Sequence, residues 1–239
     1  GSSWTEVNDL NLIRGQNVGA GTYTASITFG GISPPQSPAE IAKTESWDGT
    51  NWTEVNALNQ GKYGMSGFGT QTAAVSGGGY TTTAVNNTET WNGSSWTEVN
   101  EMNTARWYLT GAGTQTSGIA AVGATPSQVN NVETWDGTSW SETTEANTAR
   151  DQMCDGAGSS ANNAIIYGGA TPSASALTEQ WDGTSWTEVA DLATARKGIG
   201  SFGASSKSAV AASGATPTRI TNTEDWNEAD FLIKTVTTS

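Results

Sequence analysis

The chain has 239 residues, carries a formal net charge of −13 with a pI near 4.2, and is only 14% charged. Soluble domains average about 25% charged residues, and nucleic-acid binding depends largely on Lys and Arg that neutralise phosphates. Ten basic residues on so acidic a chain therefore argue against a nucleic-acid partner. The sequence has no histidine, which removes the commonest general base and every Ser-His or Cys-His arrangement. We expect no enzymatic activity, no cofactor and no metal site, and the lack of a long apolar run predicts no membrane insertion.

In chain order, the first candidate element is a short strand at residues 3–8. It contains Trp4-Thr5-Glu6-Val7, and the same four residue types return at Trp52 and at Trp96. Five further Trp segments then follow at intervals of 44, 44, 46 and 45 residues, each with an acidic residue two positions before its Trp. A second aromatic stands five residues after each of these Trp residues. A period of 40–50 residues with aromatics at fixed offsets is typical of a radial repeat array. The five Trp residues are Trp47, Trp91, Trp135, Trp181 and Trp226.

Each unit reads as four short strands. In the third unit we expect strands at 105–114, 118–123, 131–135 and 140–143, with a tight turn at Asp136-Gly137 because Asp-Gly tolerates the positive φ of hairpin turns. Strands of this length with frequent turn signals predict an all-β chain, a five-bladed β-propeller of four-stranded antiparallel blades. The whole chain, 1–239, forms a single propeller domain, with units at about 12–56, 60–100, 104–144, 148–190 and 194–239.

Two strands compete for the last place in the fifth unit. One is the N-terminal strand at 3–8, and the other is the C-terminal segment that begins at Phe231. The N-terminal strand fits the repeat better and would leave a Trp uncovered if it stayed unpaired. We therefore expect residues 3–8 to close the ring beside Ile220–Trp226, with Phe231–Thr237 outside it.

A basic residue opens the first strand of the units, glycines close the second, an aromatic lies in the third and a Trp opens the fourth. The basic residues are Arg14, Lys62, Arg106, Arg150 and Arg196, and the glycine positions are Gly30-Gly31, Gly77-Gly78, Gly123-Ala124, Gly168-Gly169 and Gly214-Ala215. In this pattern the units resemble kelch repeats. The resemblance also extends to Thr/Asn/Trp-rich kelch-like repeats of phage and marine microbial surface proteins. It implies a binding scaffold rather than chemistry, since fold does not dictate function.

The constant acidic and basic positions predict structure. Five Glu and five basic residues at fixed places indicate a ring of structural ion pairs, with five equivalent inter-blade ligand sites as the alternative. The repeated Trp residues should pack blade against blade, and a ladder of Trp rings that binds sugars is the second interpretation. The Glu residues are Glu45, Glu89, Glu133, Glu179 and Glu224.

The residue after each basic one varies freely, as do the loops between the second and third strands. Variation on one face of a rigid ring is typical of a binding surface, although drift in unconstrained loops would look the same. Aromatic rings beside a carboxylate and an ammonium suit a sugar. The predicted ligand-binding residues are Tyr63, Trp107, Tyr108, Asp151 and Lys197.

Two features of the fourth unit leave room for chemistry. Asp151 and Asp155 could form the carboxylate pair of a glycosidase, but four residues along a strand span about 13 Å, which is too far unless a bulge intervenes. The single cysteine, Cys154, reads as a buried small hydrophobe rather than a reactive thiol.

The sequence favours a non-catalytic recognition or adhesion module that binds a glycan or a protein. Its expected location is extracellular or on a virion, as part of a virion or microbial surface protein, with other subunits of a particle as possible partners. A purely structural propeller in a larger assembly is the first alternative, and a five-bladed glycosidase-like enzyme is the second.

Overall fold

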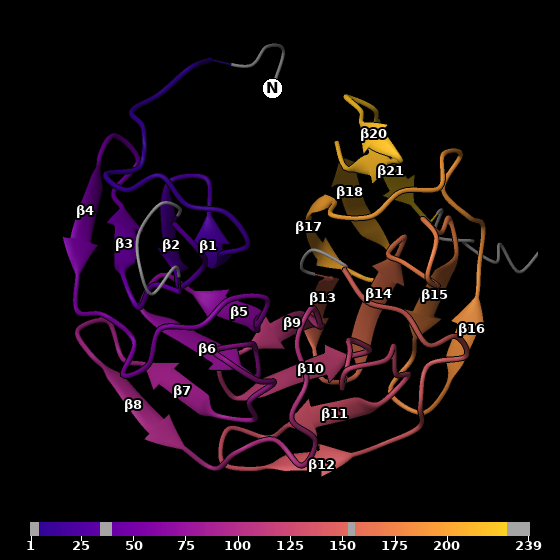
Figure 1. The fold of residues 1–239 in the computed structure, drawn as a ribbon, viewed down its shortest axis with the longest axis horizontal. Helices are drawn as coiled ribbons and strands as arrows, with labels where there is room; N and C mark the ends of the chain where they lie inside the picture. Colours follow the sequence, from indigo (N-terminus) through magenta and orange to yellow (C-terminus); the bar gives the residue numbers. More distant parts are fainter. Residues whose placement is uncertain (1–4, 34–39, 153–155, 229–239) are drawn as a thin grey trace, which may run out of the picture.

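The computed structural model describes residues 5–33, 40–152 and 156–228. Within these ranges the chain forms strands, turns and loops without a helix, so none is long and apolar enough to span a membrane. Five antiparallel blades are arranged around a central axis, as Figure 1 shows. The prediction of an all-β, five-bladed propeller is confirmed.

The first four blades each contain four strands that pair in chain order, with the first strand of each blade nearest the axis (Figure 1). In the fifth blade the described residues form three strands, and a short hairpin lies in the connection between the second and third of them. The strands are β1 (Val18–Thr22), β2 (Ala25–Phe29), β3 (Thr44–Trp47), β4 (Trp52–Val55), β5 (Ser66–Thr70), β6 (Ala73–Gly77), β7 (Thr88–Trp91), β8 (Trp96–Val99), β9 (Thr110–Thr114), β10 (Ser117–Ala121), β11 (Val132–Trp135), β12 (Trp140–Glu142), β13 (Ala157–Ser160), β14 (Asn163–Tyr167), β15 (Thr178–Trp181), β16 (Trp186–Glu188), β17 (Gly200–Ser205), β18 (Ser208–Ala212), β19 (Ala215–Thr216), β20 (Thr218–Arg219) and β21 (Thr223–Asn227).

The third blade shows where the sequence-based strand limits were too generous. Its inner strand, expected from Ala105, begins only at Thr110. Tyr108 has a φ of +53°, a left-handed conformation that interrupts an extended strand. The Arg106 side chain before it is fully buried. The other three strands lie within one or two residues of their expected limits.

The hairpin turns that close the outer two strands follow the predicted chemistry. Gly137 has a φ of +96°, which side-chain-bearing residues seldom adopt. The Asp136 carboxylate accepts hydrogen bonds from the backbone N–H groups of Thr138 and Ser139, both at 2.8 Å. These two donors, that of Ser139 first, lower the pKa of Asp136. The same turn recurs with glycines at a φ of +92° to +97° in the first, second and fourth blades, at Gly49, Gly93 and Gly183.

A pair of residues in left-handed conformation follows each second strand, which the sequence analysis did not predict. In the second, third and fifth blades this pair is one residue away from the glycine positions that carry the kelch resemblance, at Gly78-Gly79, Val122-Gly123 and Ser213-Gly214. Its second member is always glycine, and in the first, second, third and fifth blades a Cβ there would meet the carbonyl oxygen of a variable residue. In the third blade that contact would be 2.9 Å from the Trp107 oxygen.

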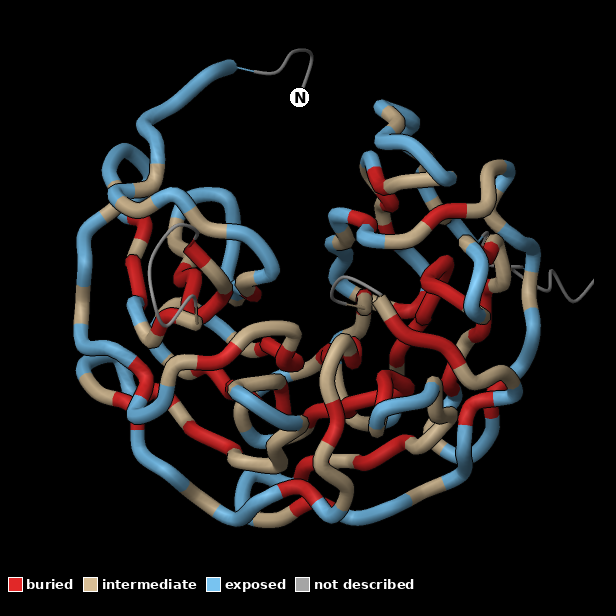
Figure 2. The backbone as a smooth tube through the Cα atoms, viewed as in Figure 1, coloured by how far each residue is buried: buried red, intermediate tan, exposed pale blue. Residues whose placement is uncertain are grey.

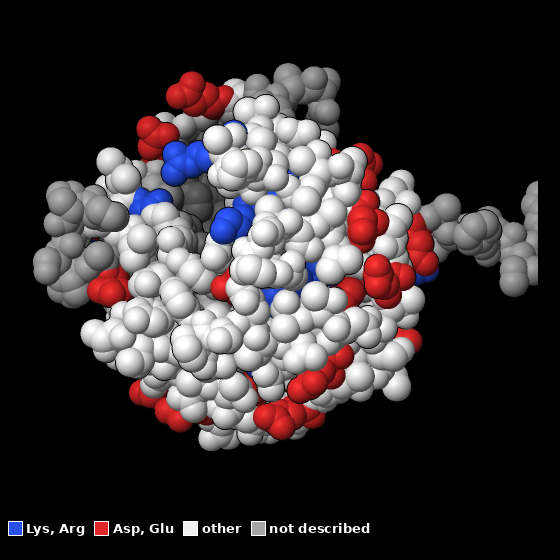
Figure 3. Space-filling model, turned by 45° about the vertical axis from the view of Figure 1, so that its right-hand side comes forward, with Lys and Arg blue, Asp and Glu red and all other residues white. Residues whose placement is uncertain are grey.

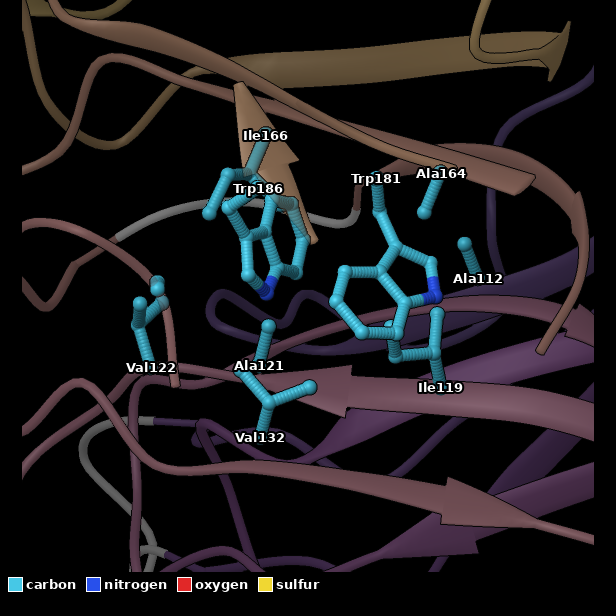
Figure 4. Close-up of a cluster of buried hydrophobic side chains, with 10 residues drawn as sticks. Ala112, Ile119, Ala121, Val122, Val132, Ala164, Ile166, Trp181 and Trp186 are labelled. Atoms are coloured by element: carbon cyan, nitrogen blue, oxygen red, sulfur yellow. The ribbon is translucent and has the colours of Figure 1, made fainter. Parts of the chain in front are cut away.

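The core lies mainly between blades (Figure 2). Figure 4 shows Trp181 and Trp186 of the fourth blade packed over Ile119 and Val132 of the third. Within a blade, the two repeated Trp rings lie 5.2–5.4 Å apart, as in the pair Trp181–Trp186. The predicted structural role of the repeated Trp residues is therefore confirmed for these blades.

The predicted ring of structural ion pairs is also confirmed. Each basic residue faces the Glu of its own blade, with N···O distances of 2.5, 3.9, 3.3, 2.8 and 3.0 Å from the first blade to the fifth. All five basic side chains are completely buried, as are the first four Glu side chains, at 0–2% exposure. Burial strips these charges of water, and the partner charge offsets much of that cost.

The first and fifth blades lie on either side of an opening in the ring, as Figure 1 shows. Between the first blade and the fifth, consecutive inner strands contact each other in the order β1, β5, β9, β13 and β17. The segment at 3–8 lies in no strand over its described residues, Thr5–Asn8, and its first two residues, like Phe231–Thr237, lie outside the described ranges. Closure of the ring by residues 3–8 stays a prediction.

Candidate functional site

The variable residues are brought to one face by a repeated backbone pairing. Each forms an antiparallel bridge with the residue that follows the left-handed pair of its own blade, where the loop to the third strand begins. The sequence analysis placed these positions beside those loops, and the pairing agrees with that placement. The bridges are Gly15 with Ile32, Tyr63 with Tyr80, Trp107 with Ala124, Asp151 with Ala170, and Lys197 with Ala215.

Four aromatic rings form a cluster on this face, made of Tyr63, Tyr80, Trp107 and Tyr108. The rings of Trp107 and Tyr108 stack with centroids 4.4 Å apart and an interplanar angle of 23°. Tyr80 lies 4.6 Å from Trp107 and 5.4 Å from Tyr63. All four residues are partly buried, and none is enclosed. We call this set the aromatic cluster; it combines ring faces with three phenol hydroxyls.

Tyr108 reaches from the third blade to the first. Its hydroxyl donates to the Gln16 side-chain oxygen at 3.1 Å, and its ring lies against Gly64 of the second blade, where a Cβ would come within 2.8 Å. The Tyr108 N–H also donates to the Gly64 carbonyl at 2.6 Å. Gly64, with a φ of +60°, therefore provides the space in which the Tyr108 ring lies.

Asp151 lies beside the aromatic cluster and is buried, at 7% exposure. Burial raises the pKa of its carboxyl, while a hydrogen bond from Gln128 and the charge of Lys197 act in the opposite direction. The Gln128 amide donates to Asp151 Oδ1 at 3.4 Å. Burial also raises the pKa of Tyr108, with a smaller contribution from the Asp151 charge. Asp151 thus links the cluster electrostatically to Lys197.

A surface hollow of about 360 Å³ continues this face beyond Lys197. Gln152, Lys197, Ser213 and Arg219 are the polar residues that line it, together with Gly198 and Ala215. In Figure 3, Lys and Arg side chains lie around a hollow, and Asp and Glu side chains lie mainly toward the edge of the view. On a chain with a net charge of −13, the variable face therefore combines aromatic, acidic and basic groups.

The structure brings the predicted residues together in two parts. Tyr63, Trp107 and Tyr108 are in ring contact, and Asp151 and Lys197 interact through their charges. Sequence reasoning missed Tyr80, Gln128 and Arg219. The signal that could have found Tyr80 is its place directly after the Gly77-Gly78-Gly79 run, opposite the variable Tyr63.

Two residues named in the sequence analysis lie outside the described ranges. They are Asp155, the partner of Asp151 in the glycosidase hypothesis, and Cys154. The residues described here contain no group of three or more Cys, Asp or Glu side chains arranged to hold a metal ion.

No protein-family model and no curated protein matches the chain. The geometry of the variable face therefore carries the functional argument.

Proposed function

We propose that this protein is a non-catalytic, kelch-like recognition module that binds a glycan through the variable face. The observation that carries the proposal is the aromatic cluster, in which Tyr63, Tyr80, Trp107 and Tyr108 come from two blades and remain partly exposed. Trp107 stands outside the repeated Trp positions, so blade packing does not account for it. Partly exposed rings that keep a polar edge are suited to the apolar face of a sugar.

The polar groups beside the cluster fit the same ligand class. Asp151 accepts hydrogen bonds and Lys197 donates them, which are the two contacts that sugar hydroxyls require. We place the module on a virion or microbial surface, in keeping with its resemblance to Thr/Asn/Trp-rich surface repeats, and a surface protein is the second partner class.

One observation favours the structural alternative. The rings of the aromatic cluster stack on one another, with Trp107 between Tyr80 and Tyr108, so the cluster could rigidify the face without a ligand. The two functions predict different effects of removing Trp107. Removal should weaken glycan binding if the module recognises a glycan, and it should change stability alone if the propeller is purely structural.

A glycan array probed with the full chain, followed by titration of the strongest binder, tests the proposal. Trp107→Ala should weaken binding about 10- to 100-fold, equivalent to ~1.4–2.8 kcal/mol. Tyr23→Ala is the matched control, because Tyr23 is 93% exposed and lies in the β1–β2 turn, away from the variable face. Binding to no glycan, or equal losses for both variants, would favour the structural alternative.

A further inference from the structure

Among the described residues, no fourth strand pairs with β21 at the edge of the fifth blade. The Glu224 side chain is 25% exposed, against 0–2% for its four counterparts. Trp226 is partly buried, whereas Trp91, Trp135 and Trp181 are 1–2% exposed. In the other blades the fourth strand pairs with the third and covers both positions.

The hollow beside Trp226 matches the site that holds Trp96 between the first and second blades. Trp96 packs among Phe29, Leu58 and Trp91, and its indole N–H donates to Thr44 Oγ1 at 3.0 Å. The equivalent residues of the fourth and fifth blades all line the hollow: Tyr167, Leu192, Trp226 and Thr178. We call this hollow the Trp226 socket.

From this match we infer that the Trp226 socket holds the indole of Trp4, with the chain's own residues Trp4–Val7 as the fourth strand of the fifth blade. The sequence Trp-Thr-Glu-Val-Asn at 4–8 is identical to that at 52–56 and at 96–100. The register of the first blade, with Trp47 opposite Trp52 and Ser46 opposite Thr53, transfers directly. It places Trp4 opposite Trp226 and Thr5 opposite Asp225.

The described part of the N-terminal segment already has the matching connection. The Asn8 side chain donates to the Thr50 carbonyl at 2.9 Å. Asn56 and Asn100, which also follow a fourth strand, donate to the corresponding carbonyls of Ser94 and Thr138 in the next blade. Asn8 is therefore attached to the first blade in the same way as Asn56 and Asn100, which each follow a fourth strand, are attached to the next blade.

The turn of the fifth blade disfavours the competing C-terminal segment. The hairpin between third and fourth strands needs a glycine at a φ of +92° to +97° in the other four blades. The fifth blade has Glu228 at this place, without a positive φ, and its N–H donates to the Lys207 carbonyl at 2.9 Å. Up to Glu228, its last described residue here, the chain therefore keeps pairing beside β18 and does not form the turn that leads to a fourth strand in the other blades.

Closure would also cover apolar surface on both sides of the opening. Phe202 is 51% exposed, whereas its equivalent Phe68 is 4% exposed and lies 6.2 Å from Trp140 of the following blade. The residue equivalent to Trp140 in the first blade is Trp52, which is less deeply buried than Trp96, Trp140 and Trp186. Burial of Phe202 against Trp52 would favour the closed ring.

Cysteine cross-linking of the full chain tests the inference. In a Cys154→Ser background, Thr5→Cys with Asp225→Cys should oxidise to an intramolecular disulfide in most of the protein, while Thr5→Cys with Thr218→Cys should not. Disulfide-linked oligomers would show that a second copy fills the socket, and equal cross-linking of both pairs, or of neither, would also overturn the inference.

Thermal unfolding gives a second test that needs no new bond. Trp4→Ala should lower the Tm by about 6–12 °C, as expected for loss of a buried aromatic from a domain of this size. Phe231→Ala is the matched control and should change the Tm by less than about 2 °C. The reverse order would assign the socket to the C-terminal segment, and no effect of either variant would show that neither fills it.

Discussion

Replacement of Trp135 by Ala tests the packing that holds the blades together. Trp135 is 1% exposed and packs in a cluster with Phe68, Met102 and Trp140. Its ring lies 5.3 Å from Trp140, and its indole N–H donates to the Gln115 carbonyl at 2.7 Å. Because Phe68 belongs to the second blade and Trp135 to the third, the change would open a cavity where two blades meet.

The expected loss is about 3–5 kcal/mol of unfolding free energy, the usual cost of truncating a buried aromatic. Part of it, ~1 kcal/mol, reflects the hydrogen bond to Gln115. Trp107→Ala is the comparison, since Trp107 is only partly buried and its ring contacts are with Tyr63, Tyr80 and Tyr108. Loss of these partly exposed contacts should cost about 1–2 kcal/mol of unfolding free energy.

Urea unfolding followed by far-UV circular dichroism measures both variants against the parent chain. With unchanged slopes, a shift in midpoint converts directly to free energy, and Trp135→Ala should also lower the Tm by about 6–20 °C. Equal losses for the two variants, or a larger loss for Trp107→Ala, would refute the distinction between repeated scaffold Trp and variable-face Trp.

Three further predictions address the ion pairs and the backbone. Burial lowers the pKa of Lys62 to about 8 in the folded chain, from 10.5, with Glu89 opposing the shift. Between about pH 8 and 10 the unfolded chain therefore binds one proton more than the folded chain at this lysine. The unfolding free energy of the parent, relative to that of Lys62→Met, should rise with pH across this window. If urea titrations show a difference between the two proteins that does not change with pH, the reasoning is wrong. Glu133→Gln should lower the unfolding free energy by about 3–5 kcal/mol, because it leaves the buried charge of Arg106 without a partner. The double variant with Arg106→Met should recover much of that loss, which a double-mutant cycle measures. Gly31→Ala should lower the unfolding free energy by more than ~1 kcal/mol, because Gly31 has a φ of +102° and a Cβ there would lie 2.7 Å from the Gly15 oxygen. A Cβ at Gly15 would meet nothing within 4 Å. Gly15→Ala is therefore the control, and its unfolding free energy should lie within about 0.5 kcal/mol of that of the parent.

The repeat made the scaffold predictable because its interactions are local or recur at a fixed spacing. Asp136-Gly137 predicts its own turn, since the Asp carboxylate and the glycine φ act within four residues. Arg106 and Glu133 could be paired from five concordant copies. What the sequence did not reveal was the backbone between Arg106 and Thr110, where Tyr108 has a φ of +53°, a conformation that an aromatic residue seldom adopts.

The sequence predicted which repeat positions form the candidate site, but it predicted fewer of the contacts between their side chains. The repeat brings Tyr63 and Trp107 to equivalent places, and their variation marked them. Tyr80 joins them through a bridge to Tyr63, a contact that depends on the glycine turn before it. The sequence did not reveal this left-handed turn, because two blades form it with Val122 or Ser213 at a φ of +56°, a conformation that residue type favours only for glycine.

The division between constant scaffold and variable face has a physical basis in the basic residue of each blade. Arg150 donates to the Leu177 carbonyl at 2.5 Å and to Glu179 at 2.8 Å, both within its own blade. Its carbonyl accepts from the N–H of Gly123 in the preceding blade at 2.9 Å. Buried side chain and backbone thus fix the position of the residue that follows, Asp151, without using its side chain. The next position is therefore free to carry Gly, Tyr, Trp, Asp or Lys while the fold stays the same, which is the property that a recognition surface needs.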